Sequence, residues 1–241
     1  MNWKRRARYI LTAAFLVVMS CSGCSLHPES SYDRSGIAMD TTVSLRATGK
    51  EAQEAVDESF ARIARLDALA SSQNPDSDVS KINAAAGSHY VQVEPAVYEM
   101  ISFAKGFSER SSGEWDITVG IITNLWQIGT EHQHVPEAGE LAEAMQRVNY
   151  KDILLRPEDH SVMLAKAGMS IDLGGVAKGY AVDEVRKIYE AHHIESGLIN
   201  MGASSMYAVG KTSKGKAWNI GMKHPRSDKD GEYLGIVSIE N

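Results

Sequence analysis

The stretch SIDLGGVAKGYAVDEV, residues 170–185, joins a short apolar segment to two adjacent glycines and then to a helical pattern. Apolar residues recur at helical spacing from Val176 onward, so the stretch predicts a strand, a tight turn and a helix. Gly174 and Gly175 let the backbone approach a ligand closely, and the free N–H groups of the following helix favour an anion there. The spacing matches neither the dinucleotide-binding fingerprint nor the P-loop. The pattern alone therefore leaves two interpretations open, a structural turn and a phosphate-binding turn.

Upstream, the chain begins with the organisation of an export signal. A basic segment, MNWKRRAR, precedes an apolar run of about 11 residues and then the small, cysteine-bearing SCSGCS. The apolar run is shorter than the ~20 residues that a membrane-spanning helix needs. The SGC ending at Cys24 resembles the bacterial lipobox, so we expect a signal peptide at 1–23, lipidation at Cys24 rather than Cys21, and a tether at 24–35. The chain is thus expected to be an exported bacterial lipoprotein, membrane-anchored and facing the periplasm or cell exterior.

The remaining chain is acidic and has no thiol. After residue 24 it holds 21 basic and 31 acidic residues, a net charge of −10. Proteins that bind nucleic acids through surface charge have the opposite balance, so we expect no nucleic-acid partner. Both cysteines lie in the signal region, which leaves none for a disulfide, a zinc site or redox chemistry in the body.

The body, residues 36–241, alternates strand and helix patterns. Apolar alternation over 36–49 predicts a strand, and 50–71 then has helical spacing. The segment 72–87 is rich in turn residues and is predicted as a loop, while Pro95 marks the start of another helix. Further strands are predicted in YVQVE, DILL, SVMLA, MSIDL, SGLINMGASSMYAVG, AWNIGMKHP and YLGIVSIEN, and a further helix in the second half of the insertion 130–150. The pattern predicts an α+β fold with mixed or antiparallel sheets and packed helices.

Five motifs follow one another along the body. They are AMDTTVS (38–44), DSDVSKIN (76–83), GEWDITVG (113–120), DLGGVAKGY (172–180), and GLINMGASSMYAVGK with WNIGMKHP. In this order they resemble the Met-Gly-Thr strand, the Asp-Ser-Xaa-Ile-Ser-Arg-Asn loop, the Phe-Asp-Ile-Thr-Val-Gly element, the glycine signature and the Gly-Gly-Asp strand of the FAD:protein FMN transferases, the ApbE-like flavin transferases. The ordered agreement, from about residue 36 to 226, is more specific than any one motif.

This resemblance implies two lobes flanking a flavin cleft. It implies an enzyme that moves FMN from FAD, with Mg²⁺ on the pyrophosphate, onto a Thr or Ser hydroxyl of an acceptor redox protein and releases AMP. The residues that it implies for FAD binding are Met39, Gln73, Glu114, Trp115, Asp116, Asp172 and Lys178, and Gly175 is implied to offer its backbone carbonyl to the metal. Such groups suit phosphoryl transfer, which requires chiefly that charge be neutralised and aligned, and Mg²⁺ prefers oxygen ligands.

Some features leave alternatives open. The residues alone also allow a core position for Trp115 and a turn position for Asp116. Asp40 replaces the glycine that the family has after its methionine, and GASS at 202–205 replaces Gly-Gly-Asp. The family continues past the position of residue 241 into segments that supply metal ligands and the base, so we expect 36–241 to be a transferase domain lacking its C-terminal part. Two other functions therefore compete with transfer: a lipoprotein that binds FAD without catalysis, and an FAD pyrophosphatase.

Overall fold

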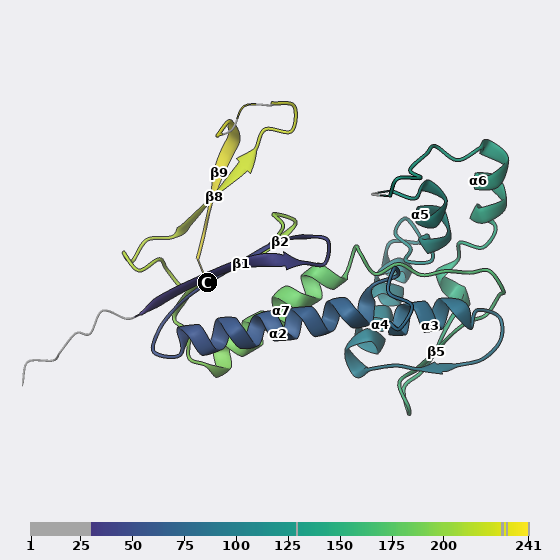
Figure 1. Ribbon diagram of the computed structural model, residues 1–241, viewed down its shortest axis with the longest axis horizontal. Helices are drawn as coiled ribbons and strands as arrows, with labels where there is room; N and C mark the ends of the chain where they lie inside the picture. The colour runs from purple at the N-terminus through teal and green to yellow at the C-terminus, as the bar shows by residue number, and fades with distance from the viewer. Residues whose placement is uncertain (1–29, 129, 228, 230, 241) are drawn as a thin grey trace, which may run out of the picture. The chain divides into compact units, whose positions relative to one another are not determined.

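The computed structural model describes residues 30–128, 130–227, 229 and 231–240, and its elements carry the labels of Figure 1. The predicted signal peptide, the lipidation site Cys24 and the tether up to residue 29 lie outside the described residues. All the elements described below belong to the compact unit Ser31–Asn241. In this described part of the chain, no helix is both long enough and apolar enough to cross a membrane.

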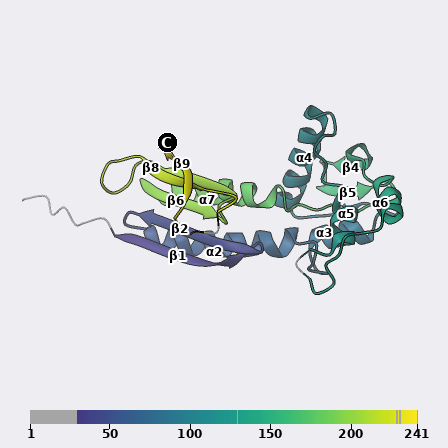
Figure 2. The same cartoon turned by 90° about the horizontal axis from the view of Figure 1, so that it is seen from above.

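The larger sheet has four antiparallel strands in the order β1-β2-β6-β7. The strands are Ser31–Ala38 (β1), Thr41–Thr48 (β2), Ser196–Met201 (β6) and Ser205–Val209 (β7). Two long helices, α2 (Ala52–Ala70) and α7 (Ala177–Ala191), pack against each other and against this sheet (Figure 2). The β2 residues Val43, Leu45 and Ala47 are buried, because strand alternation turns them to one face, against the helices.

A smaller antiparallel sheet has the order β3-β5-β4. Its strands and the neighbouring helices are β3 (Val91–Gln92), β4 (Ile153–Arg156), β5 (Ser161–Leu164), α3 (Asp78–Ala84), α4 (Pro95–Arg110), α5 (Gly120–Trp126), α6 (Ala138–Met145) and the short 3-10 helix η1 (Tyr150–Asp152). Ile82 of α3, Met100 of α4 and Leu164 of β5 belong to the same buried cluster as Ile199 of β6. The two sheets therefore share one continuous core.

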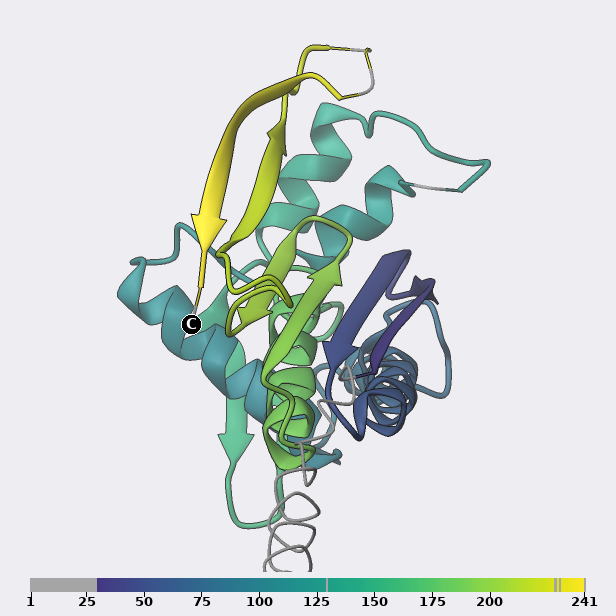
Figure 3. The ribbon, with the colours of Figure 1, turned by 90° about the vertical axis from the view of Figure 1, so that its left-hand side faces the viewer.

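The last two strands, β8 (Trp218–Lys223) and β9 (Tyr233–Ile239), form an antiparallel hairpin, drawn in yellow in Figure 3. Within the described residues they pair only with each other. Trp218 is buried, but other large apolar side chains of the hairpin are exposed: Met222, Tyr233, Leu234, Ile236 and Val237. A two-stranded ribbon of this kind is marginally stable by itself.

The predicted α+β class is confirmed. Every pairing between the labelled strands is antiparallel, and helices pack on the sheets. The helix predicted over 50–71 is α2, the helix predicted from Pro95 is α4, and the opening stretch does lead through a turn into α7.

Two predictions near the N-terminus are wrong. The predicted tether of 24–35 is too long, because residues 31–35 belong to β1 and pair with β2. The single strand predicted over 36–49 is two strands, because Met39 and Asp40 have φ values of 50° and 56° and reverse the chain between β1 and β2. Apolar alternation continues through the turn, so it did not reveal the reversal.

Two predictions of local structure are also wrong. The segment 72–87, predicted as a loop, contains α3, whose N-terminus is capped by the Ser77 hydroxyl accepting the Ser80 N–H. The segment MSIDL, predicted as a strand, forms only one isolated parallel bridge, from Ser170 to Val119. Hydrogen bonds from the Asn83 side chain to Ile171 and from the Asp172 N–H to the Ile117 carbonyl oxygen hold this segment in place of a strand ladder.

Candidate functional site

The glycine turn of the stretch 170–185 is held by its own polar groups. The Asp172 carboxylate Oδ1 accepts the Gly174 N–H at 2.7 Å, and the Ala177 N–H donates to the Leu173 carbonyl oxygen at 2.8 Å. α7 begins at Ala177, so its free N-terminal N–H groups lie at the turn. The Lys178 ammonium lies 3.5 Å from the Gly174 carbonyl oxygen. An ammonium and the positive end of a helix therefore meet at one exposed turn, which suits an anion.

A small cleft of about 200 Å³ opens beside this turn. It brings together four of the residues predicted to line FAD: Met39, Gln73, Asp172 and Lys178. They come from three separate segments, the β1–β2 turn, the segment after α2 and the glycine turn. The fold thus assembles most of the polar part of the predicted site in one place.

The β1–β2 turn forms one wall of the small cleft. Positive φ at both Met39 and Asp40 is the pattern of a type I′ hairpin turn, and it costs non-glycine residues on the order of 1 kcal/mol each. The buried Met39 donates its N–H to the Asp67 carboxylate of α2 at 2.9 Å, which fixes the turn on the helix. Asp40 is exposed and lines the cleft, so a carboxylate stands there in place of the family's glycine.

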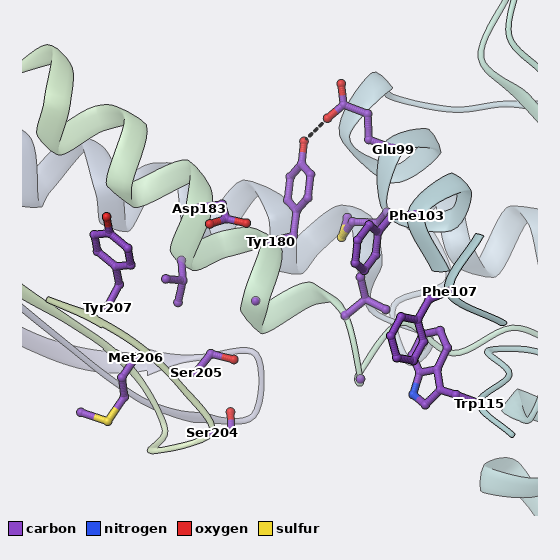
Figure 4. Close-up of a pocket in the computed structure, with 15 residues that line it drawn as sticks. Glu99, Phe103, Phe107, Trp115, Tyr180, Asp183, Ser204, Ser205, Met206 and Tyr207 are labelled. Carbon is purple, nitrogen blue, oxygen red and sulfur yellow. Dashed lines mark hydrogen bonds between the residues drawn. The ribbon is translucent and has the colours of Figure 1, made fainter. Parts of the chain in front are cut away.

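A larger cleft of about 920 Å³ borders the other side of the α7 N-terminus (Figure 4). Gly175, Val176 and Gly179 line this cleft, whereas Gly174 and Lys178 line the small one. The side chains labelled in Figure 4 come from α4, α7, the segment after α4, the β6–β7 turn and the start of β7. Among the described residues that line it there are two carboxylates, Glu99 and Asp183, and no lysine or arginine. The larger cleft is therefore aromatic, and its described lining lacks the ammonium group that the small cleft offers to a phosphate.

Trp115 and Phe107 form the aromatic end of the larger cleft. Their rings pack edge to face, with centroids 5.4 Å apart and planes at 90°. A Cβ atom on Gly175 would lie 3.4 Å from Trp115 Cζ2, so the indole ring lies over the glycine turn. Phe103, one helical turn before Phe107, is 61% exposed. Exposed aromatic faces at a cleft favour stacking with a planar ligand.

The middle of the larger cleft is crossed by a hydrogen bond between two helices. The Tyr180 hydroxyl of α7 donates to the Glu99 carboxylate of α4 at 2.6 Å (Figure 4). Partial burial, and then this hydrogen bond to Glu99, raise the pKa of Tyr180 well above its usual range. Tyr180 therefore stays protonated and acts as a donor, which ties the two walls of the cleft together.

The β6–β7 turn, where GASS replaces the family's Gly-Gly-Asp, packs beside the β1–β2 turn and lines the larger cleft. Gly202 has a φ of 65°, and a Cβ atom there would lie 1.9 Å from Thr41 Oγ1, so only glycine fits beside the β1–β2 turn. Ser204 and Ser205 line the larger cleft. The departure from the family pattern thus places two hydroxyl groups at this wall.

Two of the predicted residues lie in neither cleft's lining, Glu114 and Asp116. The Asp116 carboxylate accepts hydrogen bonds from the Thr118 N–H and hydroxyl, at 2.8 and 2.7 Å, and from the Tyr150 N–H at 2.7 Å. Its partners are those of a turn residue that joins this segment to η1. Glu114 is exposed at the turn that follows α4.

The residues around the clefts that the sequence did not indicate as site residues include Asp67, Asn83, Phe103, Phe107 and Tyr180. Phe103 and Phe107 carry a recoverable signal, because they are aromatic and fall outside the buried stripe of α4. Asn83 lies in a quoted motif, but spacing alone assigns it no partner. Tyr180 also lies in such a motif and Asp67 in the helix predicted over 50–71, but their contacts depend on packing between segments far apart in the sequence.

The model of the ApbE family matches residues 39–241. A Treponema pallidum (strain Nichols) protein named FAD:protein FMN transferase is 30% identical, over 96% of this chain and 68% of that protein. A Klebsiella pneumoniae (strain 342) protein of the same name is also 30% identical, over 86% of this chain and 63% of its own length. The crystal structure of the ApbE protein from Thermotoga maritima superposes with a TM-score of 0.79 at 27% identity, over 88% of this chain and 68% of that one. The chain therefore spans about two thirds of these relatives.

Proposed function

This chain belongs to the ApbE family, and on that premise we propose that it is an FAD:protein FMN transferase. In the proposed reaction, a Thr or Ser hydroxyl oxygen of an acceptor redox protein attacks the FMN phosphorus of FAD. The bond from that phosphorus to the bridging oxygen breaks, and the hydroxyl proton passes to solvent. FMN becomes a phosphoester of the acceptor, and AMP leaves with the bridging oxygen.

The observation that carries this proposal is the position of the glycine turn between a small polar cleft and a larger aromatic one. FAD has a charged pyrophosphate joined to aromatic ring systems, so the pyrophosphate and one ring system match these two neighbouring environments. Lys178 and the free N–H groups at the start of α7 supply positive charge at the turn. Three aspartates, Asp40, Asp67 and Asp172, line the same cleft, so we propose that Lys178 and the helix start bind the phosphates together with a divalent cation.

The volumes of the clefts indicate that the small cleft alone is too small for FAD, so we propose that FAD occupies both. Clefts that hold small ligands usually measure roughly 300–1,000 Å³, and the small cleft, at about 200 Å³, falls below that range. The larger cleft, at about 920 Å³, lies within it. We therefore place one ring system of FAD against Trp115 and Phe107 and the pyrophosphate at Lys178.

Magnesium is compatible with the oxygen groups of this turn. In the described part of the chain there is no group of three or more His, Cys, Asp or Glu side chains placed to hold a metal. Mg²⁺ needs no such group, because it keeps water and substrate phosphate oxygens and takes one or two carboxylates from the protein. The Asp172 carboxylate and the Gly175 backbone carbonyl are the groups that we propose to hold it. When bound, it would neutralise charge on the pyrophosphate.

We also propose that the protein acts outside the cytoplasm as a lipoprotein. The support is the basic, apolar and cysteine-bearing order of the first residues, with Cys24 as the site of lipidation. A lipid anchor on Cys24 would hold the body at a membrane surface, where exported redox proteins are available as acceptors. Labelling with a radioactive fatty acid, lost in Cys24→Ser, tests this part.

The test of the proposed activity uses the full chain with FAD, Mg²⁺ and an apo redox protein that carries a Thr flavinylation site. Transfer yields AMP together with a fluorescent flavin on the acceptor that survives denaturing electrophoresis. AMP with free FMN and no labelled acceptor would identify a pyrophosphatase, and bound FAD without AMP would identify a flavin-binding protein. Either of these two results contradicts the proposal.

A further inference from the structure

We propose that Asn83 is a positioning residue, which holds the glycine turn at the spacing from the opposite wall of the small cleft that FAD binding requires. The inference rests on the proposed function for its ligand. It concerns a residue of α3 that lines neither cleft and whose side chain acts on the backbone of a segment 88 residues away.

The contact is a two-point hydrogen bond between one side chain and one residue's backbone. Asn83 Oδ1 accepts the Ile171 N–H at 2.8 Å, and Asn83 Nδ2 donates to the Ile171 carbonyl oxygen at 3.1 Å. An amide side chain offers one acceptor and one donor side by side, so it satisfies both backbone groups as a neighbouring strand would. This explains how the chain before the turn is held although it has no strand ladder there.

Asn83 is one of four constraints on the same short segment. The Asp172 N–H donates to the Ile117 carbonyl oxygen at 2.9 Å, and the Ile171 side chain is fully buried. A Cβ atom on Gly120 would lie 2.7 Å from the Ile171 carbonyl carbon, so α5 approaches this backbone as closely as a glycine permits. Beyond residue 172 the turn is exposed at Gly174 and Gly175. The positions of the turn's functional groups therefore depend on how the chain is fixed at 171 and 172.

The same short helix also fixes the other wall of the small cleft. Ser77, the N-cap of α3, donates its hydroxyl proton to the Ser71 carbonyl oxygen at 2.6 Å, and the Ser80 hydroxyl donates to the Ser72 carbonyl oxygen at 3.3 Å. Ser71 and Ser72 line the small cleft beside Gln73. α3 thus binds the Gln73 wall at its first turn and the glycine-turn wall at its last, through Asn83. One rigid helical segment sets the distance between them.

The test compares Asn83→Asp with the wild-type full chain. Asp has the shape of Asn, but its carboxylate has no donor for the Ile171 carbonyl oxygen. A protonated carboxyl regains one donor and one acceptor, so low pH restores both bonds. We expect FAD affinity, by fluorescence titration, to fall at least tenfold relative to wild type at pH 7.5. We expect that ratio to shrink towards one near pH 4.5. A carboxylate partly buried at this position would also destabilise the fold in a pH-dependent way, so affinities are compared only where urea unfolding shows both proteins to be folded at both pH values.

Two control variants and a second readout complete the test. Asn219→Asp makes the same chemical change on the exposed face of β8, and Val162→Ala destabilises the core at β5 without touching the turn. Both should bind FAD like wild type whenever they are folded. Hydrogen exchange of the amides at 171–174 should accelerate in Asn83→Asp and in Asn83→Ala, and not in the two controls.

The results that overturn the inference are specific. If Asn83→Asp binds FAD within twofold of wild type at pH 7.5, or if its defect is independent of pH, Asn83 does not set the cleft. If wild type itself binds no FAD, the proposed function fails, and the exchange measurement alone then decides whether Asn83 holds the turn. Unchanged exchange at 171–174 in the Asn83 variants would overturn the inference in that case.

Discussion

The small and the larger cleft lie on two sides of the same helix N-terminus, yet their walls differ in chemistry and in construction. The small cleft is lined by Lys178 and three aspartates, and its walls are fixed by hydrogen bonds from α2 and α3. The larger cleft is lined by aromatic side chains and two carboxylates. Among the described lining residues, the lysine thus lies on one side of the turn and the ring-binding surface on the other. A single ligand that needs both must lie across the turn, and substitutions on each side should therefore affect different parts of its binding.

The largest effect is expected from removing the cation of the small cleft. Lys178→Met should lower the rate of FMN transfer by about 100-fold or more, because the ammonium opposes charge that develops on the phosphate oxygens. Binding of inorganic pyrophosphate should weaken as well. Lys214→Met, an exposed lysine in the turn between β7 and β8, serves as the matched control in AMP release and titration assays. Equal activity of the two variants would place the pyrophosphate elsewhere.

Crowding of the backbone that leads into the glycine turn should destabilise the fold. In Gly120→Ala the added Cβ would lie 2.7 Å from backbone atoms of Ser170 and Ile171, which cannot move aside as a side chain would. We expect a loss of about 1–3 kcal/mol in the free energy of unfolding, measured with urea. Gly139→Ala in α6, where a Cβ meets nothing within 4 Å, should not lower the free energy of unfolding. A neutral Gly120→Ala would show that the glycine turn is not braced by α5.

Loss of the aromatic surface should affect only the larger cleft. Trp115→Leu is expected to weaken FAD binding about tenfold, as the loss of one stacking partner does. Binding of inorganic pyrophosphate should be unchanged, in contrast to Lys178→Met. Trp126→Leu, in α5 and in neither cleft's lining, is the control. Equal losses for FAD and pyrophosphate in Trp115→Leu would mean that the clefts are not separate sites.

The smallest effect concerns an ionic cluster away from both clefts. His192 lies between Glu58 and Glu51, at 2.8 and 2.9 Å, and the hydrogen bond to Glu58 raises its pKa, opposed by partial burial and aided by Glu51. His192 therefore binds its proton more tightly in the folded state than in the unfolded state. Its contribution is full below the unfolded-state pKa of about 6.5 and is lost as pH rises through the folded-state pKa.

This cluster is tested by urea unfolding between pH 5.5 and 9. His192→Gln should be less stable than wild type by up to about 1 kcal/mol at pH 5.5, and the difference should diminish at high pH. His193→Asn, the adjacent residue with a positive φ that Asn tolerates, should show no such pH dependence. FAD affinity should be the same in all three proteins. A gap that widens with pH would have the wrong sign for this cluster.

The outline of the fold was accessible from the sequence because periodicity and helix-start signals are local. α2, α4 and α7 were predicted from apolar spacing and from Pro95. The β1–β2 turn was not, because Met39-Asp40 is not a typical type I′ pair such as Asn-Gly or Asp-Gly and the apolar alternation runs through it. Their positive φ values follow from a partner, Asp67, that lies 28 residues away.

The candidate site was predictable where one short segment carries it and not where packing assembles it. The glycine turn with Lys178 was visible as a motif, and its neighbours Met39 and Gln73 were named from the resemblance. Asn83 and Tyr180 act through contacts across 88 and 81 residues, which no spacing rule describes. Asp116 shows the reverse case, since its motif position suggested a ligand contact and its hydrogen bonds are those of a turn.

Asp40 has a consequence for how this protein responds to random mutation. Aspartate and glycine codons differ by one nucleotide, so Asp40→Gly is present in any library of single-base changes. Glycine relieves strain on the order of 1 kcal/mol at a φ of 56° and removes a carboxylate from the small cleft. Selection for heat resistance would enrich this codon change. Selection for flavin transfer would enrich or remove it according to what that negative charge does beside the pyrophosphate. The two screens together therefore measure the effect of Asp40 on stability and its effect on catalysis.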